Sequence, residues 1–167
     1  MAAVTSELIK ELRERTAAGM LDCKKALTEC DGDMDAAIDW LRKKGLSAAA
    51  KKSGRTATEG TITIELSADN KKATISEVNC ETDFVGQNEN FIEFCATTTA
   101  HIHTSGIKNV DELLASTING NAFSDHLSVT ISKIGENIVV RRFAEVSVGE
   151  NGSVSAYKHA NGKIGVI

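Results

Sequence analysis

The chain has 167 residues and a formal net charge of −4, with 41% hydrophobic and 25% charged residues. This length predicts one medium domain or two small ones. The fractions of hydrophobic and charged residues are ordinary for a soluble globular protein. A net acidic chain disfavours direct nucleic-acid binding, which usually needs a basic surface. Since no apolar run approaches the roughly 20 residues of a membrane helix, we expect no membrane span.

The N-terminus and the cysteines favour a reducing compartment. A polar, amphipathic pattern follows Met1 without the apolar segment of a secretory signal, so we expect a cytoplasmic protein. The cysteines form no Cys-x-x-Cys pair and have no zinc-finger spacing with histidine. We therefore expect reduced, mostly buried thiols. The cysteines are Cys23, Cys30, Cys80 and Cys95.

Residues 1–54 predict a three-helix module followed by a linker helix. The first helix is broken at residues 16–19, and a second short helix starts near Asp22. A third helix follows the turn at 31–33, and Gly45 is a plausible C-terminal stop for it. The alanine- and lysine-rich segment after Gly45 then predicts a short helical linker.

Residues 55–148 predict a core α+β subdomain. Strict alternation over residues 61–66 indicates a half-buried strand, and residues 72–80 form its expected hairpin partner. Apolar residues then recur at helical spacing between 91 and 134, and a long strand is expected over 138–148. The predicted fold class is α+β, with an N-terminal helical module and an antiparallel sheet packed with helices.

Residues 149–167 predict the start of a second, incomplete core subdomain. A strand is expected over 154–158, and Asn161-Gly162 is a strong signal for a two-residue hairpin before an apolar final strand at 164–167. Such a strand at a sheet edge would leave its backbone groups unpaired. We therefore expect either further chain beyond it or pairing with another chain, which in a homodimer would be a second copy.

Several stretches resemble one family, in its order and spacing across the whole chain. The strongest are LRERTAAGMLDCKKAL at residues 12–27 and EVNCETDFV at 77–85; weaker matches are KIGEN at 133–137 with Arg141-Arg142, and YKH at 157–159 with KIGV at 163–166. Together they resemble the elongation factor Ts family, whose N-terminal three-helix module is similar to ubiquitin-associated domains. Longer family members continue into a second subdomain, and short members work as homodimers.

The resemblance implies a translation elongation factor that is not an enzyme. Such a factor binds elongation factor Tu in its GDP-bound and nucleotide-free states and promotes GDP release as a guanine nucleotide exchange factor. It implies no metal or other cofactor in the chain itself, and no direct contact with nucleic acid or membrane.

The Thr-Asp-Phe-Val motif supplies the central candidate residues. In the family, the phenylalanine inserts between helices of the Tu GTPase domain and disturbs the region that holds Mg²⁺ and the β-phosphate. This implies that Phe84 is exposed and that Asp83 fixes the loop and makes polar contacts at the same edge. The residues alone favour another interpretation, in which Thr82 or Asp83 caps a helix reaching Ile102 and Phe84 is a core aromatic, and the resemblance reverses this preference. The candidate residues of the motif are Thr82, Asp83, Phe84 and Val85.

Further partner contacts follow from the same resemblance. Met20 and Leu21, with Arg13 nearby, suit an interface anchor, although they could instead staple the start of a helix. A loop after the last predicted helix is expected against the partner, and His159 is similar to a partner-contacting histidine or is simply a surface residue. These candidates are Arg13, Met20, Leu21, Ile134, Gly135, Glu136, Asn137 and His159.

Two rival functions compete with exchange. The first is an adaptor whose three-helix module binds ubiquitin-like or helical partners. The second is an enzyme that uses Cys80 or Cys95 with a histidine. The second is disfavoured because Cys80 lies within a strand pattern and no histidine has a motif beside it.

Overall fold

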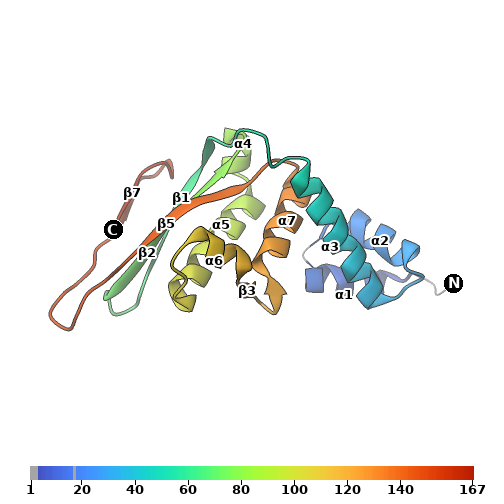
Figure 1. Cartoon of the computed structure of the whole chain (residues 1–167), viewed down its shortest axis with the longest axis horizontal. Helices are drawn as coiled ribbons and strands as arrows, with labels where there is room; N and C mark the ends of the chain where they lie inside the picture. Colours follow the sequence, from blue (N-terminus) through green and yellow to red (C-terminus); the bar gives the residue numbers. More distant parts are fainter. Residues whose placement is uncertain (1–3, 17) are drawn as a thin grey trace.

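The computed structural model describes residues 4–16 and 18–167. The molecule is elongated, with the N-terminal helices at one end and the main sheet with the C-terminal hairpin at the other (Figure 1). The N-terminal module comprises α1 (Ser6–Thr16), α2 (Met20–Glu29) and α3 (Met34–Ala50). None of the helices in the described residues is both long and apolar enough to cross a membrane.

Side-chain caps and a small apolar cluster define the N-terminal module. The Thr5 hydroxyl accepts the Leu8 N–H at 3.3 Å, and the Asp33 carboxylate accepts the Ala36 N–H at 2.8 Å, so α1 and α3 begin where short polar side chains satisfy free backbone donors. The cluster is small, as expected for a module of about 50 residues. Its buried members are Leu12, Cys23, Ala26, Leu27, Ala37 and Leu41.

The prediction that Gly45 stops the third helix is wrong. Helix α3 continues through Gly45 to Ala50, and the expected linker helix is its last part. Gly45 is buried, and a Cβ added to it would lie 3.5 Å from the backbone of Ser128 in α7 (Phe123–Ile134). The glycine therefore serves close helix packing, and the helix formers around it carry α3 onward.

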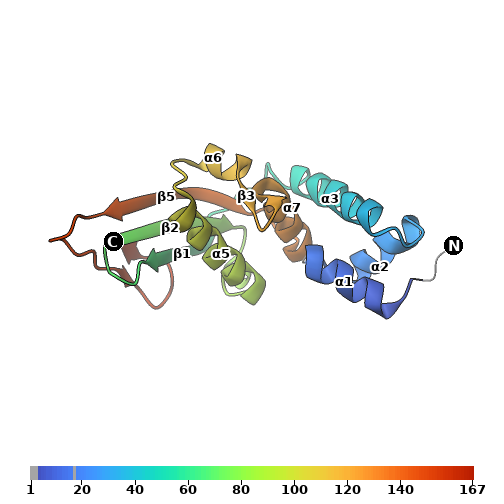
Figure 2. The ribbon, with the colours of Figure 1, turned by 90° about the horizontal axis from the view of Figure 1, so that it is seen from below.

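The core subdomain is an antiparallel sheet covered by helices on one face. Strands β1 (Glu59–Leu66), β2 (Lys72–Cys80) and β5 (Val139–Ser147) pair in the order β1-β2-β5. Helices α5 (Glu89–Ser105), α6 (Val110–Ala115) and α7 lie on the face seen in front in Figure 2. A short hairpin of β3 (Thr117–Ile118) and β4 (Asn121–Ala122) precedes α7. These elements confirm the predicted α+β class.

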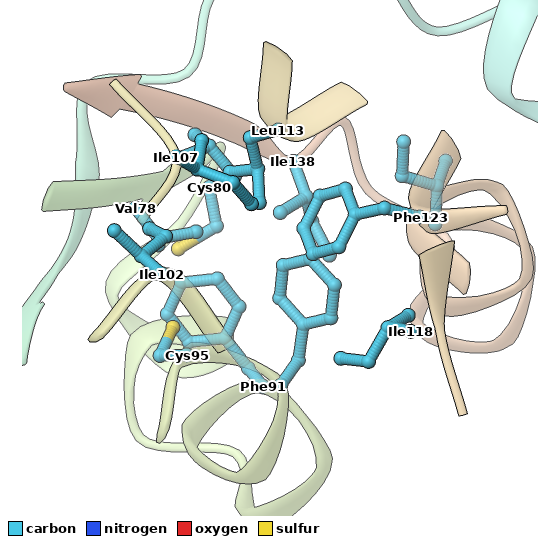
Figure 3. Packing of buried hydrophobic residues seen from close by; sticks show 13 residues of the cluster. Val78, Cys80, Phe91, Cys95, Ile102, Ile107, Leu113, Ile118, Phe123 and Ile138 are labelled. Carbon is cyan, nitrogen blue, oxygen red and sulfur yellow. The ribbon is translucent and has the colours of Figure 1, made fainter. Parts of the chain in front are cut away.

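The main core lies between the sheet and these helices. Phe91 from α5, Phe123 from α7 and Ile138 just before β5 point toward a common centre (Figure 3). At the side of this core, the hydroxyls of Ser76 in β2 and Thr99 in α5 are 2.6 Å apart, which satisfies two buried polar groups together.

The C-terminal residues fold back on the opposite face of the sheet. The expected strand over 154–158 is shorter than predicted: only β6 (Tyr157–Lys158) pairs with β7 (Gly165–Val166). The turn is also longer than two residues, because the His159 N–H donates to the Ile164 carbonyl at 2.9 Å. Packing on β1 explains this shape, since the Ile62 N–H donates to the Gly162 carbonyl at 2.7 Å.

The division of the chain at residues 54 and 148 stays a prediction, as does pairing of β7 with a second copy. Residues 149–167 contact β1 directly, and a Cβ on Gly165 would overlap the Ile62 side chain at 2.5 Å.

Candidate partner-binding site

The candidate motif forms a one-turn helix of its own. Helix α4 (Asp83–Gly86) lies between β2 and α5, and the Thr82 hydroxyl accepts the Val85 N–H at 3.4 Å as its N-cap. The longer helix α5 has a separate cap, Asn88, whose side chain accepts the Asn90 N–H at 3.0 Å. Thr82 is therefore a capping residue, but not for the helix that reaches Ile102. We call residues 82–86 the Phe84 turn.

Phe84 points away from the protein while its neighbour Val85 points inward. The Phe84 side chain is 85% exposed, and Val85 packs against the main core. Asp83 is exposed beside Phe84. The core-aromatic interpretation of Phe84 is thus excluded in this structure, and an apolar ring with an adjacent carboxylate stands on the surface.

Two glycines, Gly60 and Gly86, let the backbone of β1 approach the Phe84 turn closely. A Cβ on Gly86 would lie 3.6 Å from the Gly60 carbonyl oxygen at the start of β1. Gly60 itself has φ +134°, and a Cβ there would overlap the carbonyl oxygen of Val78. Only glycine suits such a backbone, so β1 can run directly beneath the turn.

Glu136 binds the Phe84 turn from the end of α7. Its Oε2 accepts the N–H groups of Glu81 and Thr82, each at 3.0 Å, and its Oε1 accepts the Thr82 hydroxyl at 2.7 Å. These are charge-assisted hydrogen bonds, which are stronger than neutral ones. Glu136 was expected against a partner, and here it is used inside the molecule.

Glu81 makes the converse contact. Its Oε1 accepts the Asn137 N–H at 2.6 Å and lies 3.5 Å from the Arg55 guanidinium. Asn137 is only 3% exposed, and its side chain donates to the Arg55 carbonyl at 2.8 Å. Asn137, expected on an interface, is therefore an internal residue. We call residues 135–138 the Gly135 loop.

Ile134, at the end of α7, and Gly135, at the start of the Gly135 loop, differ in exposure. Ile134 is half-buried against the main core, and Gly135 ends α7 with φ +90° and remains exposed. A left-handed glycine at this position is the usual way to end a helix. Among the residues expected here, only Gly135 is fully on the surface.

The N-terminal candidates lie near α7, the helix that precedes the Gly135 loop. Met20 and Leu21 are 58% and 81% exposed at the start of α2, and Arg13 is exposed on α1. Just before them, Gly19 lines a cavity of about 20 Å³ together with Lys133 near the end of α7. An ion pair between Lys44 and Asp22 borders that cavity. The exposed apolar pair thus follows a turn that faces α7.

His159 belongs to the C-terminal hairpin. It is exposed, and its Nδ1 is 2.8 Å from the Tyr157 hydroxyl. Lys163 in the same turn pairs with Glu59, the residue before Gly60. The turn after His159 therefore lies at the end of the sheet on which the Phe84 turn rests.

The cysteines do not form a reactive site. The Cys80 thiol donates to the Thr82 carbonyl at 3.1 Å, and burial raises the pKa of Cys80 to about 11. Burial likewise raises the pKa of Cys95 to about 12. Both thiols stay protonated near neutral pH, which disfavours a cysteine nucleophile. The described part of the chain contains no group of three or more side chains suited to hold a metal ion.

Comparison with known proteins identifies the family. The family model for elongation factor TS matches residues 81–167, a range that begins at Glu81 and includes the Phe84 turn and the Gly135 loop. The chain belongs to the elongation factor Ts family. Its α1–α3 module lies outside that match, but the similarity to the elongation factor Ts protein of Wolinella succinogenes covers 100% of this chain and so includes the module.

Curated proteins named elongation factor Ts resemble nearly the whole chain. The protein from Campylobacter concisus is 53% identical over 98% of this chain and 46% of its own length. Those from Clostridium novyi and Nitratiruptor sp. are 53% and 54% identical over 98% and 99% of the chain, and 54% of their own lengths. The chain spans about half the length of the curated elongation factor Ts relatives it matches.

Sequence reasoning missed Glu81, and it also did not single out Arg55, Gly60 or Gly86 for this site. Glu81 stands in the quoted motif at 77–85, directly before Thr82, but nothing in its spacing pointed to the Gly135 loop. The pairing with Asn137 spans 56 positions, so no local pattern carries it.

Proposed function

We propose that this chain is a guanine nucleotide exchange factor that binds GDP-bound elongation factor Tu and promotes GDP release without covalent chemistry. The observation that carries the proposal is the 85% exposure of Phe84 on a turn that is anchored by Thr82 and by the packing of Val85. Burial of the Phe84 ring against a partner would remove apolar surface from water, which stabilises the complex.

In this proposal, Phe84 inserts into the GTPase domain near the Mg²⁺ and phosphate region of the partner. A rigid base matters, because an apolar side chain on a mobile loop would lose much of its effect to ordering entropy. The exposed carboxylate of Asp83 adds negative charge at the same edge, where it can compete for cationic groups that hold phosphate.

Magnitudes require more than one contact. Acceleration of nucleotide release by about 10⁴-fold corresponds to about 5.5 kcal/mol. Burial of one phenylalanine contributes about 1.5–3 kcal/mol. We therefore propose that Arg13, Met20 and Leu21 hold the GTPase domain while Phe84 acts, with exposed Gly135 and His159 as further contacts.

Linkage then explains release of the factor. If the chain weakens GDP binding by some factor, GDP weakens binding of the chain by the same factor. Returning nucleotide would therefore dissociate the complex and free the chain for another partner molecule.

A direct test follows GDP release from purified elongation factor Tu carrying a fluorescent GDP analogue. Addition of the chain in excess should speed the loss of signal in proportion to its concentration, until the rate saturates. A release trace that does not change at any concentration of the chain would contradict the exchange function.

A binding adaptor is the second candidate, supported by the exposed pair Met20 and Leu21 on the helical module. Binding of the chain to a helical partner, together with unchanged GDP release, would favour it over exchange.

A further inference from the structure

We propose that Glu81 and Glu136 are positioning residues that fasten the Phe84 turn to the end of α7 through a reciprocal clamp. Each carboxylate accepts backbone N–H groups from the segment that carries the other. The functional part of this inference rests on the exchange function proposed above, whereas the geometric part does not.

The clamp uses backbone donors that the sheet leaves without partners. Strand β2 pairs with β5 as far as Asn79 and with β1 as far as Cys80, so the N–H groups of Glu81 and Thr82 lie beyond both ladders. Glu136 accepts both at 3.0 Å. A buried backbone donor without a partner is costly, so the carboxylate selects one position for the start of the Phe84 turn.

The contact from the Asn137 N–H to Glu81 fixes the second segment, the Gly135 loop. Asn137 follows the left-handed Gly135 that ends α7, and its N–H donates to Glu81 at 2.6 Å. Two segments 55 positions apart are thus held by contacts running in both directions. A change in either segment displaces the acceptor that the other one needs.

Arg55 contacts both Glu81 and the Gly135 loop. Its guanidinium lies 3.5 Å from Glu81, and its carbonyl accepts the Asn137 side chain at 2.8 Å. The segment before β1 therefore closes the clamp from a third side.

Helix α7 extends the clamp to the N-terminal module. Gly45 of α3 meets the backbone of Ser128 and Val129, and the same helix ends at the loop that carries Glu136. In our proposal, the exposed Met20–Leu21 pair and Phe84 therefore keep a fixed relative placement through packed elements, so that a grip on a partner by the module directs the ring.

The first experiment tests the geometry in the free chain. The protein is labelled with 4-fluorophenylalanine, and the Phe84 signal among the five phenylalanines is assigned with a Phe84→Leu variant. Glu136→Ala, which removes all three acceptor contacts, should shift or broaden the ¹⁹F signal of Phe84. Glu136→Gln keeps an oxygen for the two N–H groups and should restore the native signal. Glu150→Ala, in the turn after β5, is the matched control.

An unmoved Phe84 signal in Glu136→Ala would overturn the clamp, because the Thr82 cap and Val85 packing would then suffice. If Glu136→Ala does not fold, Glu81→Ala replaces it and should move the same signal, since it removes the acceptor of the Asn137 N–H. No effect of Glu81→Ala on Phe84 would overturn the reciprocal arrangement.

The second experiment separates positioning from direct contact with the partner. At saturating chain, Glu136→Ala should slow GDP release on the order of tenfold or more, with affinity for nucleotide-free elongation factor Tu changed much less. A proportional loss of affinity and rate would mean that Glu136 contacts the partner itself, and would overturn the proposal. If the unaltered chain does not accelerate release, the exchange function fails, while the ¹⁹F result still decides the clamp.

Discussion

Phe84 and Val85 are adjacent on one helical turn, yet their side chains point in opposite directions. Val85 packs against the main core, whereas Phe84 is 85% exposed. The packing of Val85 and the Thr82 cap hold the backbone of the turn, so the Phe84 ring projects from a defined place on the surface. The consequences of this arrangement can be measured.

Phe84→Ala should leave the fold intact and impair exchange. Removal of an exposed side chain changes the free energy of unfolding by about 0.5 kcal/mol or less. GDP release from elongation factor Tu should slow far more than binding weakens. The control is Phe91→Ala, which truncates a fully buried ring and should cost about 3–5 kcal/mol. A similarly large stability loss for Phe84→Ala would show that the ring is part of the core.

Leu21→Ala should weaken binding of elongation factor Tu without loss of stability. Leu21 is 81% exposed, while Leu27 on the same helix is fully buried. Truncation of an apolar side chain that anchors an interface costs about 1–2 kcal/mol of binding free energy. Titration calorimetry with nucleotide-free partner and thermal unfolding separate the two effects. Leu27→Ala should show the opposite pattern, with a lower melting temperature; unchanged affinity in Leu21→Ala would remove it from the interface.

Gly45 should tolerate alanine but not a larger side chain. A Cβ at Gly45 would lie 3.5 Å from the Ser128 backbone, an ordinary contact distance. Alanine should therefore stabilise the chain by about 0.5–1 kcal/mol through its higher helix propensity. Gly45→Leu should instead separate α3 from α7 and lower stability. Chemical denaturation of both variants checks this, and equal stability of the leucine variant would mean that the helices are not closely packed there.

His126 should make the chain less stable as the pH falls. Burial lowers the pKa of His126 below its ordinary 6.5, and the nearby Glu93 opposes this only in part. Below pH 6.5 the unfolded chain binds a proton at this position more readily than the folded one, so the free energy of unfolding decreases. Denaturation curves between about pH 7.5 and pH 5 should show a smaller decrease for His126→Gln. The same slope in both proteins would indicate an ordinary titration in the folded state.

The regular elements were largely predictable from local patterns. Alternation in β1, helical spacing in α5 and the end of α7 before Gly135 all lie where the sequence placed them. These features depend on residues a few positions apart. The Thr-Asp-Phe-Val motif was also found from the sequence. The exposure of its Phe84 agrees with what the family resemblance implied.

The misplaced features depend on distant parts of the chain. Gly45 in isolation indicates a helix stop, but packing against Ser128 makes it an interior residue of α3. The C-terminal turn is wider than its Asn-Gly signal predicts, because the Gly162 carbonyl pairs with Ile62 of β1. In both places a contact with another element outweighs the local preference of glycine.

The sequence by itself determined the α+β class and the main helices and strands, since these follow from spacing and side-chain chemistry along the chain, and the family motifs were found by resemblance. Only the tertiary structure decided which motif residues face outward. Glu136 and Asn137 resemble surface residues in sequence, yet they pair with Thr82, Glu81 and Arg55. The reason is that the end of β2 and the loop after α7 come together only when the sheet and helices are assembled. Each segment then supplies a carboxylate that accepts the free backbone N–H groups of the other.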